Sequence, residues 1–188
     1  RSLQKALTFD PGFATQNLLT ASMEARGAHL SNQQGQEFYQ RTLERVGGLP
    51  GVQAVTLSTV VPLSGGGQRR MITLEGYQPQ PNEDTELNTN VVSLNFFNTM
   101  GIPIVAGRDF NTQDREGGAL VVIVNEEVAR RYYGGNAIGK RLQIGSNVPS
   151  REIVGVARTA RYRNLREQPL PFIYIPLGQE YQSGMTLL

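Results

Sequence analysis

Residues Gly134 to Lys140 follow the spacing Gly-x-x-x-x-Gly-Lys, which is the spacing of a loop that cradles nucleotide phosphates. A Ser or Thr follows the lysine in such loops and binds magnesium, but Arg141 stands at that position. A phosphate loop also follows a strand and opens a helix, because the helix N-terminus helps to bind the phosphates. Here the apolar pattern predicts a helix before the motif and a strand after it. We therefore interpret residues 134–141 as a helix-to-strand turn and expect no nucleotide to bind.

A second run of polar residues, Asp109, Asn111, Gln113 and Asp114, resembles the start of a calcium-binding loop. That loop requires glycine at its sixth position and an acidic residue at its twelfth. Asp114 and Leu120 occupy these two positions. We therefore interpret the run as acidic residues of a surface turn, and we expect no calcium site.

Residue types that could build a catalytic or zinc site are scarce. The chain has one histidine, His29, and no cysteine, so neither a zinc ligand set nor a thiol nucleophile can be assembled. No Gly-x-Ser-x-Gly serine is present for the histidine to activate. A hydrolase is the weakest hypothesis, and we expect a protein that is not an enzyme and has no cofactor or metal.

The one basic stretch of the chain is the remaining candidate site. Nucleic-acid binding would use its arginines on phosphates and its tyrosine for stacking. A solvated face is the simpler interpretation, because Glu152 and Glu167 lie among the arginines and the net charge is only +2. A surface for a partner protein is a third possibility. Arg151 begins the stretch, and the candidate partner surface consists of Arg158, Arg161, Tyr162, Arg163 and Arg166.

Length and composition indicate an ordinary folded domain. The chain has 188 residues, of which 39% are hydrophobic and 18% charged, which suits one domain or two small subdomains. Its longest apolar run, residues 119–124, is far shorter than the roughly 20 residues that a membrane helix needs. The chain does not begin with Met, so we expect Arg1 and Leu188 to be cuts within a longer protein.

Apolar periodicity predicts the elements that must position these residues. Residues 17–25 alternate as a strand, Ser31 or Asn32 caps a helix that runs to Val46, and residues 52–61 form a second strand, giving one αβ unit. Residues 77–88 are predicted to be an exposed loop. Two further helices are predicted, at 94–100 with Ser93 as the cap and at 126–133. Further strands are predicted at residues 71–76, 90–92, 102–106, 120–124, 141–144, 152–156 and 172–175.

An ordered set of short blocks resembles the periplasmic core domain of MacB-like ABC-type permeases, and most resembles the duplicated orphan permeases of acidobacteria. The resemblance covers nearly the whole chain. Its N-terminal and central blocks are Asp10-Pro11-Gly12-Phe13, Asn17-Leu18-Leu19-Thr20, Leu49-Pro50-Gly51-Val52, Pro62-Leu63-Ser64-Gly65-Gly66-Gly67, Val92-Ser93-Leu94-Asn95-Phe96-Phe97 and Met100-Gly101-Ile102-Pro103. Its later blocks are Ala106-Gly107-Arg108-Asp109-Phe110, Val122-Ile123-Val124-Asn125-Glu126, Ala129-Arg130-Arg131-Tyr132-Tyr133, Ile138-Gly139-Lys140-Arg141, Arg151-Glu152-Ile153-Val154-Gly155-Val156 and Ile173-Tyr174-Ile175-Pro176-Leu177.

The resemblance implies an α/β (α+β) fold in which a porter-like subdomain with a mixed sheet carries an inserted, strand-rich subdomain. We expect residues 1–16 to be a juxtamembrane lead-in and residues 17–100 to form the first part of the porter-like subdomain. Residues 101–178 would form the inserted subdomain, and residues 179–188 would start the second part of the porter-like subdomain. One continuous sheet through all strands would argue against this division.

The same resemblance implies a function and a location. It implies an extracytoplasmic (periplasmic), non-catalytic domain of an inner-membrane ABC transporter permease, with a role in efflux or in mechanical coupling across the envelope. The implied partners are the permease's own membrane helices, a second permease copy and a separate ATPase subunit, but no nucleic acid and no small-molecule cofactor. The alternative is a basic-surface module that binds nucleic acid or protein.

The C-terminal residues 185–188 are predicted to begin another strand. An unpaired strand edge exposes backbone N–H and C=O groups. We therefore expect this edge to be buried against a second copy of the chain, in a dimer that is not the biological assembly.

Overall fold

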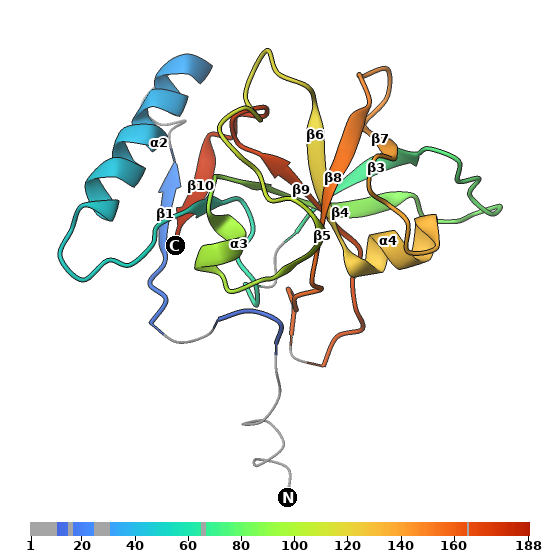
Figure 1. The fold of residues 1–188 in the computed structure, drawn as a ribbon, viewed down its shortest axis with the longest axis horizontal. Coiled ribbons are helices and arrows are strands. Elements are labelled where there is room, and N and C mark those ends of the chain that lie inside the picture. The colour runs from blue at the N-terminus through green and yellow to red at the C-terminus, as the bar shows by residue number, and fades with distance from the viewer. Residues whose placement is uncertain (1–10, 15–16, 25–30, 65–66, 165) are drawn as a thin grey trace, which may run out of the picture.

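The computed structural model describes residues 11–14, 17–24, 31–64, 67–164 and 166–188 (Figure 1). His29 lies outside the described residues. The helices are α2 (Asn32–Gly47), α3 (Phe96–Thr99) and α4 (Glu126–Tyr133). The strands are β1 (Ala21–Glu24), β2 (Leu57–Ser58), β3 (Gln68–Leu74), β4 (Glu86–Val92), β5 (Ile104–Gly107), β6 (Val121–Asn125), β7 (Arg141–Ile144), β8 (Arg151–Ala157), β9 (Phe172–Pro176) and β10 (Gly184–Leu187).

Two of the helices begin at the polar residues that cap them. The Ser31 hydroxyl accepts the backbone N–H of Gln34, whose side chain accepts the Ser31 N–H in return, so α2 starts with a capping box. The Asn125 side chain accepts the N–H of Val128 at the start of α4. Gly134 ends α4 with a left-handed backbone, φ 57°, which glycine adopts without steric cost. The predicted bounds of α4 are confirmed.

Six strands close into a barrel. The pairing runs from β4 to β3, β7, β8, β6 and β9, and β9 pairs with β4 again. The β6–β8 and β4–β9 pairs are parallel and the other four are antiparallel. A closed ring leaves no free edge among its own strands, so these pairs hold one another in register.

Aliphatic side chains fill the inside of the barrel. Alternate residues of each strand point inward, as Ile173 and Ile175 of β9 do, and they join one buried core. The helix α4 covers one end of the barrel: its Val128 and Ala129 are buried in the same core, and the Tyr133 hydroxyl donates to the Arg141 carbonyl at 3.2 Å. The interior is therefore packed with side chains and is not a passage.

The opposite end of the barrel is covered by the chain that leaves β9, residues 177–183, which we call the strap. Glu180 in the strap pairs with Arg70 of β3 at 2.5 Å and with Arg151 of β8 at 3.6 Å. The Gln179 side chain accepts the N–H of Val121 and donates to the Ala119 carbonyl. Through these polar contacts the strap bonds to β3, β8 and β6 at the end of the barrel that it covers.

A second core lies on the outer face of the barrel. Phe172 and Tyr174 of β9 point away from the interior and pack with Phe96 and Phe97 of α3. Strands β6 and β9 are consequently buried along their whole lengths, because they separate two cores. This arrangement explains why residues 120–124 are a continuous apolar run rather than an alternating one.

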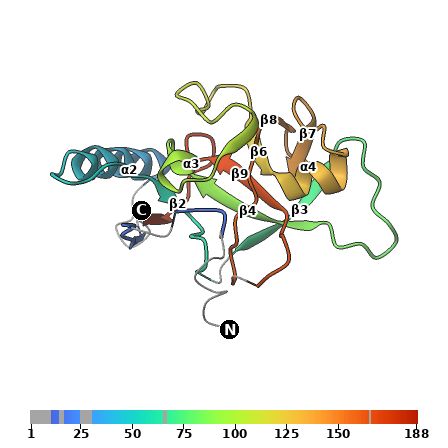
Figure 2. The same ribbon diagram turned by 60° about the horizontal axis from the view of Figure 1, so that its bottom comes forward.

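Strands β2, β10 and β1 extend the sheet beyond β4, and α2 lies beside this extension (Figures 1 and 2). Strand β10 is present, as residues 185–188 predict, but it pairs with β1 on one side and β2 on the other. The expected open edge at β10 is therefore wrong, because residues 21–24 cover it. The expected dimer depended on unpaired backbone groups at β10, and β1 already pairs with them.

The sheet also bears on the expected subdomains. The ten strands of the described residues belong to one hydrogen-bonded sheet, and β3 and β4 pair with β7 and β9 across the predicted boundary at residues 100 and 101. Continuous pairing of this kind is the result that argues against the division at 17–100, 101–178 and 179–188. The mixed α/β fold class itself is confirmed, with few helices and a multi-stranded sheet.

One predicted cap is wrong. Ser93 does not begin a helix: its hydroxyl accepts the Leu57 N–H at 2.8 Å and bonds to the Thr56 hydroxyl at 2.9 Å, both within the sheet extension. The short helix α3 begins later, after Asn95, whose backbone is left-handed. A serine before an apolar run satisfies a strand N–H as readily as a helix N-terminus, and the sequence does not distinguish the two.

Candidate functional site

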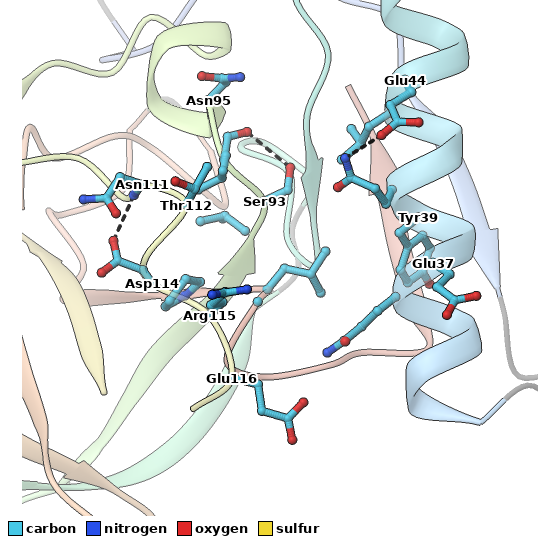
Figure 3. A pocket seen from close by; sticks show the side chains of 18 of the residues that line it. Glu37, Tyr39, Glu44, Ser93, Asn95, Asn111, Thr112, Asp114, Arg115 and Glu116 are labelled. Atoms are coloured by element: carbon cyan, nitrogen blue, oxygen red, sulfur yellow. Dashed lines mark hydrogen bonds between the residues drawn. The ribbon is translucent and has the colours of Figure 1, made fainter. Parts of the chain in front are cut away.

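A groove of about 900 Å³ separates α2 from the end of the sheet, and it is open to solvent (Figure 3). One wall is the face of α2 that carries Tyr39 and Leu43. The other wall comes from three loops, which follow β4, β5 and β9. The residues that line the groove are Gln36, Glu37, Tyr39, Gln40, Arg41, Leu43, Glu44, Val55, Val92, Ser93, Leu94, Asn95, Asn111, Thr112, Asp114, Arg115, Glu116, Pro176, Leu177 and Gly178.

The helical wall is attached to the barrel through Tyr39. Its hydroxyl donates to the Ser183 carbonyl of the strap at 2.6 Å, and its ring packs against Tyr181. Burial raises the pKa of Tyr39 to about 12, and the neighbouring Tyr181 and Glu24 add to this effect. The hydroxyl therefore stays protonated and keeps donating at any physiological pH.

The groove combines an apolar floor with charged residues at its rim. Glu37, Arg41 and Glu44 are exposed on α2, and Arg115 and Glu116 are exposed on the facing loop. The Glu44 carboxylate accepts the Gln40 side-chain amide at 2.8 Å. No described residue of the groove is a histidine or cysteine, and the rim holds solvated carboxylates and guanidinium groups rather than a nucleophile with its base. This arrangement suits contact with another polypeptide.

The run that resembles a calcium loop is held by its own side chains. Both oxygens of Asp114 accept from the Arg108 guanidinium, at 2.7 and 2.9 Å, and one also accepts the Asn111 N–H at 2.9 Å. Burial opposes ionisation of Asp114, but the hydrogen bonds from Arg108 and from the Asn111 N–H hold its pKa below the ordinary value. Asp109 accepts the Phe110 N–H. Within the described residues, no group of three or more acidic or histidine side chains is placed to hold a metal ion.

The motif that resembles a phosphate loop is the turn between α4 and β7, in the order the sequence predicts. Gly134, Gly135 and Gly139 all have positive φ. The Gly139 N–H bonds to the Ile153 carbonyl, and the Lys140 carbonyl accepts the Ile153 N–H. The backbone of Gly139 and Lys140 therefore pairs with β8, while the N–H groups of Gly135 and Asn136 bond back to α4.

The basic stretch divides into buried and exposed members. Tyr162 is 1% exposed, stacks on Phe172 with ring centroids 3.9 Å apart, and bonds to the Tyr174 hydroxyl at 3.2 Å. It belongs to the outer core and cannot lie on a partner surface or stack on a nucleic-acid base. Its inclusion in the candidate surface is a mistake of the sequence reasoning, because tyrosine between arginines carries no signal of which side it faces.

The arginines of the stretch also differ from one another. Arg151 is held in the strap network, where burial lowers its pKa despite the pairing with Glu180. Arg161 donates to the Glu167 carbonyl and is half-buried. Arg158, Arg163 and Arg166 are exposed, and none of the three forms an ion pair within the described part of the chain.

The sequence reasoning missed the strap and the groove. Gln179, Glu180 and Tyr181 are three large polar residues in a row after a buried strand, which is the only local signal of their role. What makes them important is their position across the barrel end and against α2, and that position depends on pairings distant in the sequence.

Comparisons with known proteins give one consistent family. A family model described as the MacB-like periplasmic core domain matches residues 3–187. No curated protein matches the chain. No helix among the described residues is long and apolar enough to cross a bilayer.

Two solved structures share the fold. The periplasmic region of MacB from Actinobacillus actinomycetemcomitans has a TM-score of 0.54 and 16% sequence identity, over 79% of this chain and 63% of that one. The extracellular domain of the noncanonic ABC-type transporter YknZ from Gram-positive bacteria has a TM-score of 0.51 and 18% identity, over 79% of this chain and 71% of that one. The aligned part of this chain thus spans less than two thirds of the MacB periplasmic region.

Proposed function

The chain belongs to the MacB-like periplasmic core domain family, and from this premise we propose that it is a non-catalytic domain that passes movement across the envelope within an ABC transporter permease. Domains of this family lie outside the cytoplasm, as parts of permeases that have membrane helices. The efflux role, the second permease copy and the separate ATPase subunit belong to the proposal, and the substrate is left open.

The packed barrel is the observation that carries this proposal. Its interior is filled by aliphatic side chains, and its two ends are covered by α4 and by the strap. Because close-packed side chains fill the described barrel, we propose that the domain acts through its outer surface and through its attachment to neighbouring parts. The groove beside α2 gives another polypeptide a surface on which to bind.

The alternative, a basic module that binds nucleic acid, is not favoured by the geometry. Its stacking residue, Tyr162, is buried in the outer core, and two of its arginines are held by neighbouring groups. A protein-contact role for the exposed surface remains compatible with the main proposal.

Labelling of a single cysteine in the permease that carries this domain tests the proposal. The chain has no cysteine, so in a permease made free of other cysteines Gln40→Cys in the groove gives one reactive site, and Gln78→Cys in the loop before β4 gives a control outside the groove lining. A membrane-impermeant maleimide should react with both in intact cells. The labelling rate at position 40 should differ between permeases with an active and an ATPase-dead partner subunit, and the labelling rate at position 78 should not. Equal rates in the two backgrounds would contradict movement at the groove.

A further inference from the structure

The loop between β8 and β9 presents three arginines that form no ion pair with any acidic residue the structure describes, and we propose that Arg158, Arg163 and Arg166 bind an anionic phospholipid surface. This inference rests on the proposed place of the domain in a membrane permease. It replaces the larger surface expected from the sequence, because Tyr162 and Arg161 are held within the fold.

The arginines project from an ordered base. The Arg158 N–H bonds to the Pro103 carbonyl at 2.8 Å, the Arg163 N–H to the Glu167 carboxylate at 3.0 Å, and the Arg166 N–H to the Asn164 side chain at 2.9 Å. Tyr162, stacked between these positions on Phe172, anchors the loop to the outer core. Each arginine is thus held at its backbone N–H, while its side chain is on an exposed residue.

Two carboxylates near this loop bond to its backbone and not to the three arginines. Glu167 accepts the N–H groups of Tyr162 and Arg163, at 2.5 and 3.0 Å, and Glu126 accepts the Thr159 N–H at 3.0 Å. These acids stabilise the backbone of the turn, and neither forms an ion pair with the three arginines. Residues 158–171 contain four arginines and one acidic residue, a local formal charge of +3 within a chain whose net charge is only +2.

The loop lies on the same side of the molecule as the described N-terminal segment, residues 11–14, in both views (Figures 1 and 2). The Arg161 N–H bonds to the Pro11 carbonyl at 3.0 Å. Gly12, with φ 82°, approaches the Thr159 carbonyl so closely that a Cβ would meet that oxygen at 2.7 Å. In the proposed permease this side of the domain faces the membrane, so the arginines face the lipid headgroups.

Electrostatics favour a headgroup layer as the ligand. Basic residues close to an anionic membrane each contribute about 1 kcal/mol, and the attraction decays within a Debye length. Three exposed arginines on a projecting loop match a flat layer of phosphates, which needs no cavity. Removal of all three should weaken binding on the order of a hundredfold.

Sedimentation with lipid vesicles tests this proposal directly on the 188-residue chain. The native chain should bind vesicles of phosphatidylcholine mixed with phosphatidylglycerol, should not bind phosphatidylcholine alone, and should dissociate as salt rises. The triple variant Arg158→Gln, Arg163→Gln, Arg166→Gln should lose binding. The matched control, Arg41→Gln, Arg45→Gln, Arg115→Gln, removes three exposed arginines elsewhere and should keep it.

Circular dichroism and thermal unfolding establish that both triple variants fold. Absence of phosphatidylglycerol-dependent binding, or equal loss in both variants, would overturn the proposal. The proposal would also be overturned, in favour of nucleic acid, if the native chain bound duplex DNA but no vesicles and only the triple variant at positions 158, 163 and 166 lost DNA binding. The cysteine labelling at position 40 is independent of this result, so failure of the lipid surface and failure of the proposed function can be told apart.

Discussion

The Tyr181 side chain of the strap lies directly over Gly35 in the first part of α2, so that a Cβ at Gly35 would overlap the hydroxyl and the ring. The Tyr39 ring packs beside it, and the Tyr39 hydroxyl reaches the next part of the strap at Ser183. A single glycine thus lets the strap contact α2 and the barrel end at once. The strap therefore connects α2 to the ring of strands.

Substitution of Gly35 by alanine should have opposite effects in two backgrounds. In the native chain, Gly35→Ala should destabilise the fold, because the methyl group displaces Tyr181. In a Tyr181→Ala background the same change should stabilise it by up to about 1 kcal/mol, because alanine favours the helix over glycine. Urea unfolding of the four proteins of this double-mutant cycle measures both effects. If Gly35→Ala changed the free energy of unfolding in the same direction in both backgrounds, Tyr181 would not pack on Gly35 in solution.

Asp114 should give the domain a pH-dependent stability at acid pH. Its folded-state pKa lies below the ordinary value, so it contributes stability above the unfolded pKa of about 4 that is lost as pH falls through the folded pKa. Asp114→Asn should cost about 1–2 kcal/mol at pH 7, because Arg108 is partly exposed and remains hydrated. The difference in free energy of unfolding between the native chain and Asp114→Asn should shrink as pH falls below about 4.

Urea unfolding at a series of pH values checks this prediction for Asp114. Glu37→Asn, at an exposed position on the groove rim, is a control that should change stability little at any pH. If the native chain and Asp114→Asn differed in free energy of unfolding by the same amount from neutral to strongly acid pH, the ion pair between Arg108 and Asp114 would be contradicted.

Tyr162 should contribute to loss of stability at alkaline pH. Burial raises its pKa to about 12, and burial raises that of its partner Tyr174 as well. The stability from the neutral hydroxyl is present below the unfolded pKa of about 10 and is lost as pH rises toward 12. Tyr162→Phe should lower the free energy of unfolding by about 1 kcal/mol at pH 7, because the hydrogen bonds to Asn90 and Tyr174 are lost. Above pH 10 the stability of this variant should fall less steeply with pH than that of the native chain.

Chemical unfolding between pH 8 and pH 11, roughly the range that spans the ordinary tyrosine pKa, measures this slope. Tyr132→Phe, on the partly buried side of α4, serves as the matched control. An alkaline slope that is the same in native and Tyr162→Phe chains would place the Tyr162 hydroxyl in solvent.

Local chemistry explains which elements the sequence predicts well. Helix α4 starts after Asn125, carries Glu126 and Glu127 at its start and two arginines near its end, and stops at Gly134. Each of these signals is contained within about ten residues, so the predicted bounds agree with the structure. Strand β7 follows directly after this turn and is predicted with equal accuracy.

The features that the sequence does not reveal depend on distant partners. Strand β10 looks like an open edge until β1, more than 150 residues earlier, is seen beside it. Tyr162 looks exposed among arginines, and only Phe172 and Tyr174 show that it is buried. The family blocks predict the fold class, but closure of the barrel follows from the parallel pairing of β4 with β9, which no local pattern encodes.

Distance measurement between two domains in the assembled permease tests the central claim, that this domain moves as a body when the transporter works. A spin label at Gln40→Cys of the permease, made free of other cysteines, reports the separation between copies by pulsed electron paramagnetic resonance. We expect the distance distribution to shift between the ADP-bound and the ATP-bound, hydrolysis-blocked states. An unchanged distribution in a permease whose ATPase is fully active would contradict it.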